Sequence, residues 1–413
     1  MKKDVGEILG DAGKKLSLAE VEQLDAEYSF KLFSRAPVCF ERGEGTLLFG
    51  SDGKRYLDFL GGIAVNALGH SHPAIVGAIR EQAGKFIHCS NLYYIEPQAR
   101  LARTLADISC ADRVFFCNSG AEANEAALKL AKIYRYKAGQ PKKRHIITAS
   151  DSFHGRTLAT VAATGQPKYQ KPYEPLTPGF EHVPFNNIEA LRAAASKERT
   201  NAIMLELVQG ESGVNIASRD YVQAAAAICK KLDILLILDE VQTGLGRTGK
   251  LFAYEHYGVE PDIFTLAKAL GAGFPIGAML AKGDVAEAFG PGDHGSTFAG
   301  NPLACSVGNA AVGTILREGL HDAAAEKGAY LLDKLRGLKA NCPAIREVRG
   351  IGLMAAAEFS EPVAAEIKDR LLHAGCLVGS VGASILRLLP PLTVSRGEID
   401  EAVGLLEGAL KPL

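Results

Sequence analysis

Two kinds of hydrophobic run alternate along most of the chain. Short continuous apolar runs, typical of buried strands, occur at residues 113–117, 145–149, 201–207, 234–238 and 262–267. Stretches with apolar residues at helical spacing occur at residues 74–86, 122–136 and 219–232. This alternation predicts an α/β fold with a mostly parallel sheet that helices cover on both faces.

The two ends of the chain follow other patterns. Residues 15–33 have helical spacing and begin with Ser17 and Glu20 in capping-box positions, and residues 45–60 predict a hairpin that turns at Asp52-Gly53. After about residue 305, a long helix, a strand-rich segment at 345–359 and a final helix indicate a smaller α+β unit. We therefore expect a large domain over residues 62–300 and a small domain formed by residues 1–61 together with 301–413.

The composition of the chain limits its expected classes of function and indicates its cellular compartment. The chain has 413 residues, with 46 basic and 47 acidic side chains, so its net charge of −1 argues against nucleic acid or an anionic membrane as the main partner. The basic cluster at residues 141–145 is expected to be a solvated loop. Eight cysteines without C-x-x-C or metal-ligand spacing predict reduced thiols and no metal site. Because the N-terminus also lacks a signal-peptide pattern and no segment could span a bilayer, we expect a cytoplasmic protein.

Candidate chemistry follows three of the predicted strands. Ligands of parallel sheets bind outside the carboxyl ends of the strands. Asp239 follows the run at 234–238, and Lys268 is the single charge within residues 264–275. Asn118-Ser119-Gly120 leads from a strand into a helix, where backbone N–H groups favour an anion such as phosphate.

Each of these residues also has an ordinary structural explanation when it is taken alone. Asp239 could cap a turn, and Ser119 with Glu122 has the spacing of a common capping box. Lys268 could lay its stem on apolar surface with its amine in water. Together, however, an anion cradle, a carboxylate and a lysine in apolar surroundings suit pyridoxal phosphate. This cofactor needs phosphate donors, an acid beside its pyridine nitrogen and an amine for its aldehyde.

A second glycine-rich motif does not support nucleotide binding. Residues 244–249 match G-x-G-x-x-G, but a dinucleotide fingerprint should lie directly between a strand and a helix, and here DEVQT intervenes. A P-loop needs Ser or Thr after its lysine, whereas Leu251 follows Lys250.

Several motifs together resemble the class III (ornithine-type) aminotransferases of fold type I. They are NSGAEANEAALKLA at 118–131, SFHGRT at 152–157, LDEVQTGLGRTG at 238–249, FTLAKALGAGFPIGA at 264–278 and HGSTFAGNPLAC at 294–305. The likeness extends from residue 37 to residue 393. It implies a fold type I transferase with a large domain of mostly parallel sheet and a smaller α+β domain.

The resemblance also implies roles for individual residues. Lys268 would join the cofactor aldehyde and then move a proton between substrate and cofactor, and Asp239 would pair with the pyridinium nitrogen. The further cofactor-binding positions are Ser119, Gly120, Ala121, Phe153, Val241, Gln242 and Thr297. Thr297 would reach the phosphate of a neighbouring subunit, which implies a homodimer with shared active sites.

Substrate recognition is implied at four positions. Arg156 and Ser296 correspond to substrate-binding positions, and Arg156 would hold the distant carboxylate of both amino donors. Arg387 would take the α-carboxylate of glutamate as a planar, bidentate fork. Glu211 would neutralise Arg387 when a donor without that carboxylate binds.

Two apolar positions favour one substrate within the family. Ornithine aminotransferases have tyrosines that hold a free α-amino group where this chain has Phe33 and Ile63. Apolar surroundings suit a blocked amine better than a buried charge, so we expect transfer of the δ-amino group of N2-acetylornithine to 2-oxoglutarate. N-succinyl-diaminopimelate, 4-aminobutyrate or ornithine as donor, and an aminomutase, are the alternatives. Leu207 stands where the family commonly has Pro, which leaves the role of Glu206 open.

Four further residues have no assigned chemistry. His70 and His72 are expected in a turn before Pro73 rather than in a metal site, and Cys117 as a small buried hydrophobe. His154, beside Phe153, could touch the cofactor or belong to a turn.

Overall fold

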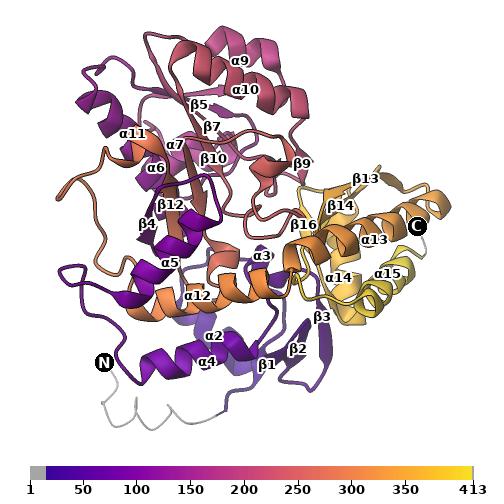
Figure 1. The fold of residues 1–413 in the computed structure, drawn as a ribbon. Helices are drawn as coiled ribbons and strands as arrows, with labels where there is room; N and C mark the ends of the chain where they lie inside the picture. The colour runs from indigo at the N-terminus through magenta and orange to yellow at the C-terminus, as the bar shows by residue number, and fades with distance from the viewer. Residues whose placement is uncertain (1–14, 412–413) are drawn as a thin grey trace.

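A seven-stranded sheet lies at the centre of the larger part of the molecule (Figure 1). The computed structural model describes residues 15–411. The strands lie in the order β4-β12-β11-β10-β7-β5-β6. They are β4 (Arg113–Cys117), β5 (His145–Ala149), β6 (Phe180–Val183), β7 (Thr200–Leu205), β10 (Leu235–Asp239), β11 (Ile263–Leu266) and β12 (Gly277–Ala281).

The pairing confirms the predicted mostly parallel sheet. β12 pairs antiparallel with both β4 and β11, and the other six strands run in one direction. The carboxyl ends of those six strands therefore share one edge of the sheet, where the amino end of β12 also lies. The sequence prediction did not include β6 or β12.

Side chains alternate between two apolar layers along the central strands. Leu236 and Leu238 of β10 pack in the core with α10 (Arg219–Leu232), whereas Leu235 and Ile237 pack on the opposite face with α6 (Gly120–Lys137). All five residues of β10 are buried. Helices on both faces explain why this strand reads as a continuous apolar run.

The remaining helices flank this sheet and build the smaller part. They are α2 (Leu18–Tyr28), α3 (Gly61–Ala64), α4 (Pro73–Ala83), α5 (Glu96–Asp107), α7 (Leu158–Ala163), α8 (Pro167–Gln170), α9 (Ile188–Ala194), α11 (Gly283–Ala286), α12 (Pro302–Arg317), α13 (Leu320–Asn341), α14 (Ala364–Ala374) and α15 (Arg396–Leu410). Within residues 15–411, none of them is long and apolar enough to cross a bilayer.

The smaller part combines both ends of the described chain. One four-stranded sheet has the order β1-β2-β3-β15, and another has the order β13-β14-β17-β16. Their strands are β1 (Phe40–Glu44), β2 (Leu47–Gly50), β3 (Arg55–Asp58), β13 (Ile345–Ile351), β14 (Met354–Phe359), β15 (Cys376–Leu377), β16 (Gly379–Val381) and β17 (Ile385–Leu388). β8 (Val208–Gln209) and β9 (Asn215–Ile216) form a separate short hairpin, and β9 packs against β13.

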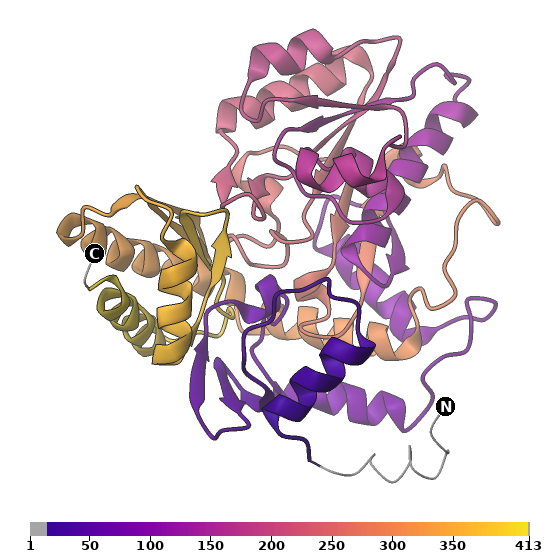
Figure 2. The same ribbon diagram turned by 180° about the vertical axis from the view of Figure 1, so that it is seen from behind.

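The N-terminal strands lie beside the C-terminal unit. β3 pairs in parallel with β15, with Leu57 opposite Cys376, and Figure 2 shows the indigo and yellow segments adjacent from behind. This pairing supports our proposed division into a large domain of residues 62–300 and a small domain from the two ends. Residues 1–14 and 412–413 of that division lie outside the described chain. The proposed boundary assigns α12 to the small domain, but this helix packs against α4 and α5 of the proposed large domain.

The terminal segments largely follow the sequence pattern. α2 begins with the predicted capping box of Ser17 and Glu20 but ends at Tyr28, short of residue 33, because Ser29 is extended. β2 and β3 form the predicted hairpin. The long helix expected after residue 305 is two helices, α12 and α13, because Gly319 between them has a φ of 59°.

The glycine-rich motif at residues 244–249 is a packing surface. Gly246 and Gly249 have positive φ, and a Cβ at Gly249 would lie 2.9 Å from the Cβ of Ala325 on α13. Between them, Arg247 is buried and donates from Nη1 to the backbone oxygens of Leu353 and Pro390, at 3.1 and 2.5 Å. The motif therefore joins the large sheet to the smaller part, in agreement with our exclusion of a nucleotide site.

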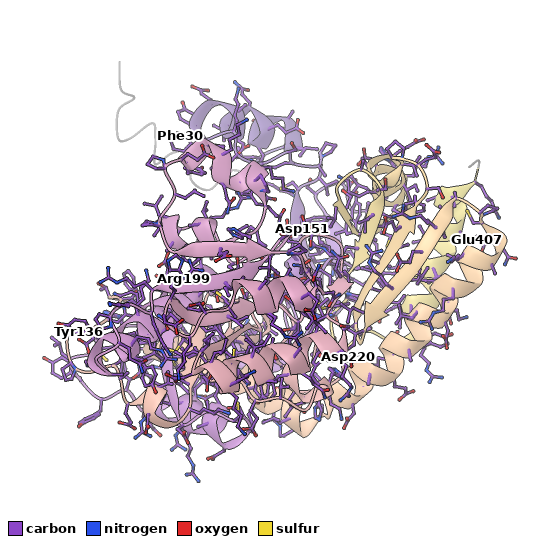
Figure 3. The ribbon with its side chains drawn as sticks, turned by 90° about the horizontal axis from the view of Figure 1, so that it is seen from above. Phe30, Tyr136, Asp151, Arg199, Asp220 and Glu407 are labelled. Atoms are coloured by element: carbon purple, nitrogen blue, oxygen red, sulfur yellow. The ribbon has the colours of Figure 1, made fainter. Side chains whose placement is uncertain are left out.

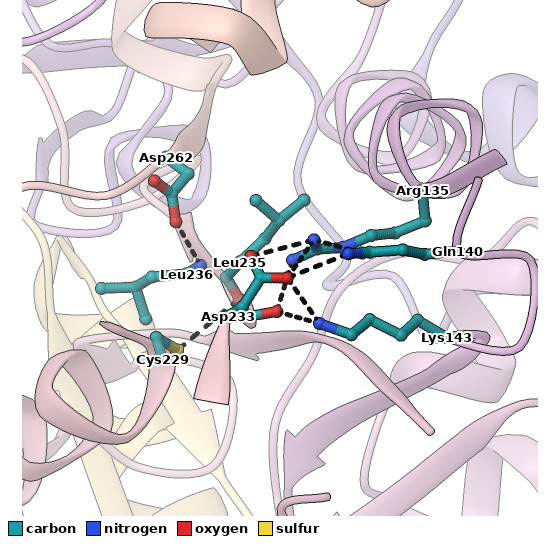
Figure 4. Close-up of polar contacts among 8 residues, drawn as sticks. All are labelled: Arg135, Gln140, Lys143, Cys229, Asp233, Leu235, Leu236 and Asp262. Atoms are coloured by element: carbon teal, nitrogen blue, oxygen red, sulfur yellow. Dashed lines mark hydrogen bonds and ion pairs between the residues drawn. The ribbon is translucent and has the colours of Figure 1, made fainter. Parts of the chain in front are cut away.

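The basic cluster at residues 141–145 is not wholly a solvated loop. Lys142 and Arg144 are exposed as expected, but Lys143 is only 7% exposed and donates to Asp233 Oδ2 over 2.8 Å. Buried Arg135 of α6 and Gln140 reach the same carboxylate (Figure 4). The prediction was wrong for Lys143 because its partner lies 90 residues away in the sequence.

Candidate functional site

A cavity of about 400 Å³ opens at the carboxyl ends of the parallel strands. Its walls come from the segments after β4, β5, β7, β10 and β11 and from the residues before β12. Nine of the thirteen site residues predicted from the sequence line it: Ser119, Gly120, Ala121, Phe153, Arg156, Asp239, Val241, Gln242 and Lys268. The remaining four, Glu211, Ser296, Thr297 and Arg387, lie outside its lining.

Lys268 enters the cavity from a strained turn. It lies two residues after β11 at the start of a 3₁₀ turn (Lys268–Leu270), and its φ of 30° is unusual for a residue with a side chain. Burial, reinforced by the cation of Arg387, lowers the pKa of the Lys268 amine to about 8, although Asp239 and Glu206 oppose the shift. About a tenth of this amine is therefore neutral, and so nucleophilic, at pH 7, which is far more than for a lysine of ordinary pKa.

Asp239 is held by donors from three elements. Its Oδ2 accepts from Asn124 Nδ2 of α6 at 2.7 Å and lies 2.8 Å from His154 Nδ1. Its Oδ1 accepts from the backbone N–H of Val241 at 3.0 Å. Thr265 of β11 fixes Asn124 by donating to its Oδ1 at 2.8 Å. The carboxylate is thus oriented at the cavity wall by a buried polar network.

The start of α6 forms an anion cradle beside the cavity. Ser119 caps the helix by accepting from the N–H of Glu122 at 3.2 Å, which leaves the first turn, with Gly120 and Ala121, along the cavity wall. A Cβ at Gly120 would lie 2.7 Å from Val241 Cγ1, so this position needs glycine. Free N–H groups and the helix dipole favour an anion at this place.

Glu206 and Gln242 complete the inner wall with unusual polar groups. Glu206 Oε2 accepts from the N–H of Phe153 at 2.7 Å, and burial together with the nearby Asp239 raises the pKa of Glu206 well above its ordinary range. Gln242 Oε1 is buried without a hydrogen-bond partner among the described residues. A ligand group in the cavity can satisfy it.

Arg387 and Glu211 meet beside the cavity. Arg387 of β17 is 4% exposed, and its Nη1 donates to Glu211 Oε2 at 3.1 Å and to the Gly210 backbone oxygen. Gly210 in turn packs against the side chain of Gln242. The smaller part of the molecule thus brings a buried cation to the edge of the cavity, with an acid that is one-third exposed as its partner.

The structure brings the other predicted residues less close to the cavity. Ser296 Oγ accepts from Asn118 Nδ2 at 3.2 Å, whereas Thr297 is exposed. Phe33 and Ile63 are 71% and 41% exposed and do not line the cavity of the single chain.

Comparison with known proteins decides the family. A model of the aminotransferase class-III family matches residues 32–410. The chain is 52% identical to the acetylornithine aminotransferase of Gloeobacter violaceus over 394 residues, which cover 95% of this chain and 98% of that protein. The chain belongs to the class III aminotransferase family.

Solved structures of class III aminotransferases have the same fold. The crystal structure of ornithine aminotransferase from Toxoplasma gondii has a TM-score of 0.92 at 32% identity and covers 99% of this chain and 98% of its own. Acetylornithine aminotransferase from Elizabethkingia anophelis has a TM-score of 0.87 at 32% identity, with coverage of 97% and 100%. These neighbours establish the fold type I architecture for this chain.

The chain is a pyridoxal-phosphate-dependent aminotransferase, and its cavity fits the cofactor. The Lys268 amine, whose pKa is lowered, suits the cofactor aldehyde. The oriented carboxylate of Asp239 suits a protonated ring nitrogen, and the anion cradle at the start of α6 suits the phosphate. The unpartnered Gln242 Oε1 is an independent sign that this wall accommodates a polar ligand.

Sequence reasoning left several residues of this aminotransferase site unassigned. Asn124 could have been noticed as a polar residue on an apolar face of α6, but nothing local indicates that it reaches Asp239, 115 residues away. His154 is now placed against the same carboxylate. Val65, Phe274 and Ile276 add apolar lining.

The residues set aside as structural have structural partners. His72 caps α4 directly before Pro73, as expected, and His70 Nε2 lies 2.8 Å from Asp58 Oδ2. Burial raises the pKa of the Cys117 thiol to about 12, so it stays a buried neutral group, as predicted. All eight cysteines lie in the described chain as free thiols.

Proposed function

We propose that this aminotransferase moves the δ-amino group of N2-acetylornithine to 2-oxoglutarate. The products would be N-acetylglutamate 5-semialdehyde and glutamate, a step of arginine biosynthesis. The observation that carries the proposal is the Arg387–Glu211 contact of 3.1 Å, which pairs a buried cation with a partly exposed acid. A site that accepts two differently charged donors needs such a pair. The printed names of the Gloeobacter and Elizabethkingia relatives support the choice of donor.

The catalytic groups are assigned by their surroundings. Pyridoxal phosphate, when bound, withdraws electrons from the bonds of the donor carbon that carries the amino group. Lys268, with its lowered pKa, would hold the cofactor and afterwards accept and return the proton of that carbon through Nζ. Asp239 would keep the ring nitrogen protonated, and Ser119, Gly120 and Ala121 would hold the phosphate.

The walls of the cavity would orient the ring. Phe153 and Val241 lie in its lining and would cover the two ring faces, and Gln242 would reach the phenolic oxygen. Glu206 has a raised pKa and lies near Lys268 and Asp239, so we propose that it remains protonated.

Two arginines would share the recognition of the donors. Arg156 at the cavity wall would bind the distant carboxylate of either donor, aided by Ser296. Arg387 would bind the α-carboxylate of glutamate after Glu211 moves aside. With N2-acetylornithine bound, Glu211 would stay on Arg387, so that no buried charge is left unpaired. Phe33 and Ile63 would favour the acetylated amine over a free one.

We also propose a homodimer in the cytosol. Ten of the sixteen large exposed apolar side chains of the described residues lie in two segments and at one further position: Tyr28, Phe30, Leu32, Phe33, Phe86, Ile87, Leu92, Tyr93, Tyr94 and Phe298. Phe30 is 87% exposed at the outer edge of the molecule (Figure 3). Such surfaces are typical of an interface, and exposed Thr297 beside Phe298 would then reach the partner's phosphate site. The free cysteines suit a reducing compartment.

The test is half-reaction spectroscopy on the purified holoenzyme. Glutamate and N2-acetylornithine should each convert the cofactor from its aldehyde form to its amine form, and ornithine should do so with much lower kcat/KM. No conversion by glutamate would contradict amino transfer through 2-oxoglutarate. Preference for ornithine over its acetylated form would contradict the proposed donor.

A further inference from the structure

Tyr169 contacts the proposed substrate-binding arginine, although nothing in the sequence marked it. The guanidinium carbon of Arg156 lies 3.8 Å from the centroid of the Tyr169 ring and 5.6 Å from that of Phe153. The two rings pack edge to face, with centroids 5.8 Å apart and planes at 78°. Arg156 therefore lies against an aromatic corner whose other member lines the cavity.

Arg156 is an exposed cation, and no carboxylate of residues 15–411 forms an ion pair with it. Its contact with the Tyr169 ring is therefore its main anchor. An arginine side chain that rotates freely loses the conformational entropy of several bonds when it binds a carboxylate. An arginine whose guanidinium already lies against a ring loses less of this entropy, because the ring keeps the group near its bound position.

The position of Tyr169 is fixed by its own short helix, α8. Gln170 donates from Nε2 to the Thr164 backbone oxygen at 2.7 Å, and Gln166 donates from Nε2 to the Ser152 backbone oxygen at 3.0 Å. Ser152 immediately precedes Phe153, and its Oγ also accepts from the N–H of Gly165 at 3.0 Å. α8 is thus hydrogen-bonded to the same loop that carries Phe153 and Arg156.

We propose that Tyr169 is a positioning residue that holds Arg156 ready for the distant carboxylate of both amino donors. The inference rests on the proposed function, because it takes glutamate and N2-acetylornithine as the donors. A guanidinium has five N–H donors and can lie on a ring face while it donates to a carboxylate, so cation–π contact and carboxylate binding are compatible. Lys168 Nζ lies 4.7 Å from the same ring centroid and adds a second positive charge that favours an anion.

The test compares Tyr169→Leu with Tyr169→Phe in holoenzyme half-reactions. Phenylalanine keeps the ring, and leucine removes it. For Tyr169→Leu, we expect the concentration of glutamate and of N2-acetylornithine at half-maximal rate to rise about 3- to 10-fold, with the limiting rate within about 2-fold of wild type. Tyr169→Phe should behave as wild type. L-alanine, which has no distant carboxylate, should react equally with all three enzymes and so reports that the site is intact.

A double-mutant cycle separates positioning from a general structural effect. In an Arg156→Gln background, Tyr169→Leu should cause no further loss for either donor, because the guanidinium it positions is gone. Equal losses with and without Arg156, equal behaviour of the leucine and phenylalanine variants, or a parallel loss with L-alanine would each overturn the inference. If wild type reacts with neither donor, the proposed function and this inference fail together. If wild type reacts and Tyr169→Leu is unchanged, only the inference fails.

Discussion

His154 Nδ1 lies 2.8 Å from Oδ2 of Asp239, and both side chains are buried. An ionised carboxylate oxygen can only accept, so Nδ1 carries the proton of this hydrogen bond. Nε2 of the ring is buried without a partner among residues 15–411. The histidine therefore acts on the site through Asp239, whose charge and orientation it stabilises together with Asn124.

Removing the Nδ1–H group of His154 should slow the half-reactions of glutamate and of N2-acetylornithine to the same extent. We expect His154→Leu to lower the limiting rates with glutamate and with N2-acetylornithine about 10- to 100-fold each, because a hydrogen bond to a charged group contributes roughly 1.5–3 kcal/mol. His154→Gln, which retains an N–H donor, should lose less. Stopped-flow rates for each donor provide the measurement, and wild-type rates in the leucine variant would rule out this role.

Loss of Arg387 should reduce kcat/KM for glutamate far more than for N2-acetylornithine. Arg387→Met is expected to reduce kcat/KM for glutamate by about 100-fold and for N2-acetylornithine by less than about 10-fold, since only glutamate places a carboxylate there. Glu211→Gln is the matched control and should impair N2-acetylornithine more than glutamate, because the buried cation then faces that donor without an acid. Equal losses for both donors in Arg387→Met would contradict the division of roles.

The buried amine of Lys268 should reduce the stability of the protein without its cofactor. The ordinary pKa of 10.5 falls to about 8 in the fold, so between these values the unfolded chain binds more protons and stability rises with pH. Near pH 7, Lys268→Met should therefore increase the free energy of unfolding of the apoprotein by about 1–3 kcal/mol. Urea denaturation measures this free energy. Lys142→Met, at an exposed position, is the control and should change it little. A destabilised Lys268→Met apoprotein would refute the effect.

The Asp233 cluster should contribute to stability with a defined pH dependence. Burial alone would raise the pKa of Asp233, but Lys143 and Arg135 outweigh it and lower the pKa below 3.8. Asp233→Asn removes the charge that faces two buried cations. Because the Asp233 side chain is 54% exposed, water screens these pairs, and we expect a loss of about 0.5–1.5 kcal/mol at pH 7. The stabilisation is complete above pH 3.8 and disappears as pH falls through the lowered pKa, so variant and wild type should converge in acid.

A surface pair provides the control for that experiment. Asp107 and Arg103 form an exposed ion pair on α5 at 3.3 Å. Asp107→Asn should change the unfolding free energy in urea by less than about 0.5 kcal/mol. If Asp107→Asn and Asp233→Asn reduce the unfolding free energy equally, the Asp233 cluster stabilises the fold no more than a surface ion pair does.

The sequence predicted the parts of the site that follow directly from strand ends. Ser119, Asp239 and Lys268 each come after an apolar run, and parallel strands bring their ends together. Asn124, His154 and Tyr169 were not assigned, because their roles depend on contacts between segments that no local pattern encodes. The prediction that Lys143 lies in a solvated loop was wrong for the same reason. β12 is a short apolar run after a glycine-rich turn, and periodicity alone does not separate such a run from a buried loop.

The covalent attachment of the cofactor to Lys268 can be measured directly. The holoenzyme is reduced with borohydride, digested and mapped by mass spectrometry, with Lys268→Met as the control. The structure predicts a single phosphopyridoxyl label, on the peptide that contains Lys268, and none in the variant. A label on another lysine, or no label on the wild-type chain, would contradict the assignment of this cavity as the site of amino transfer.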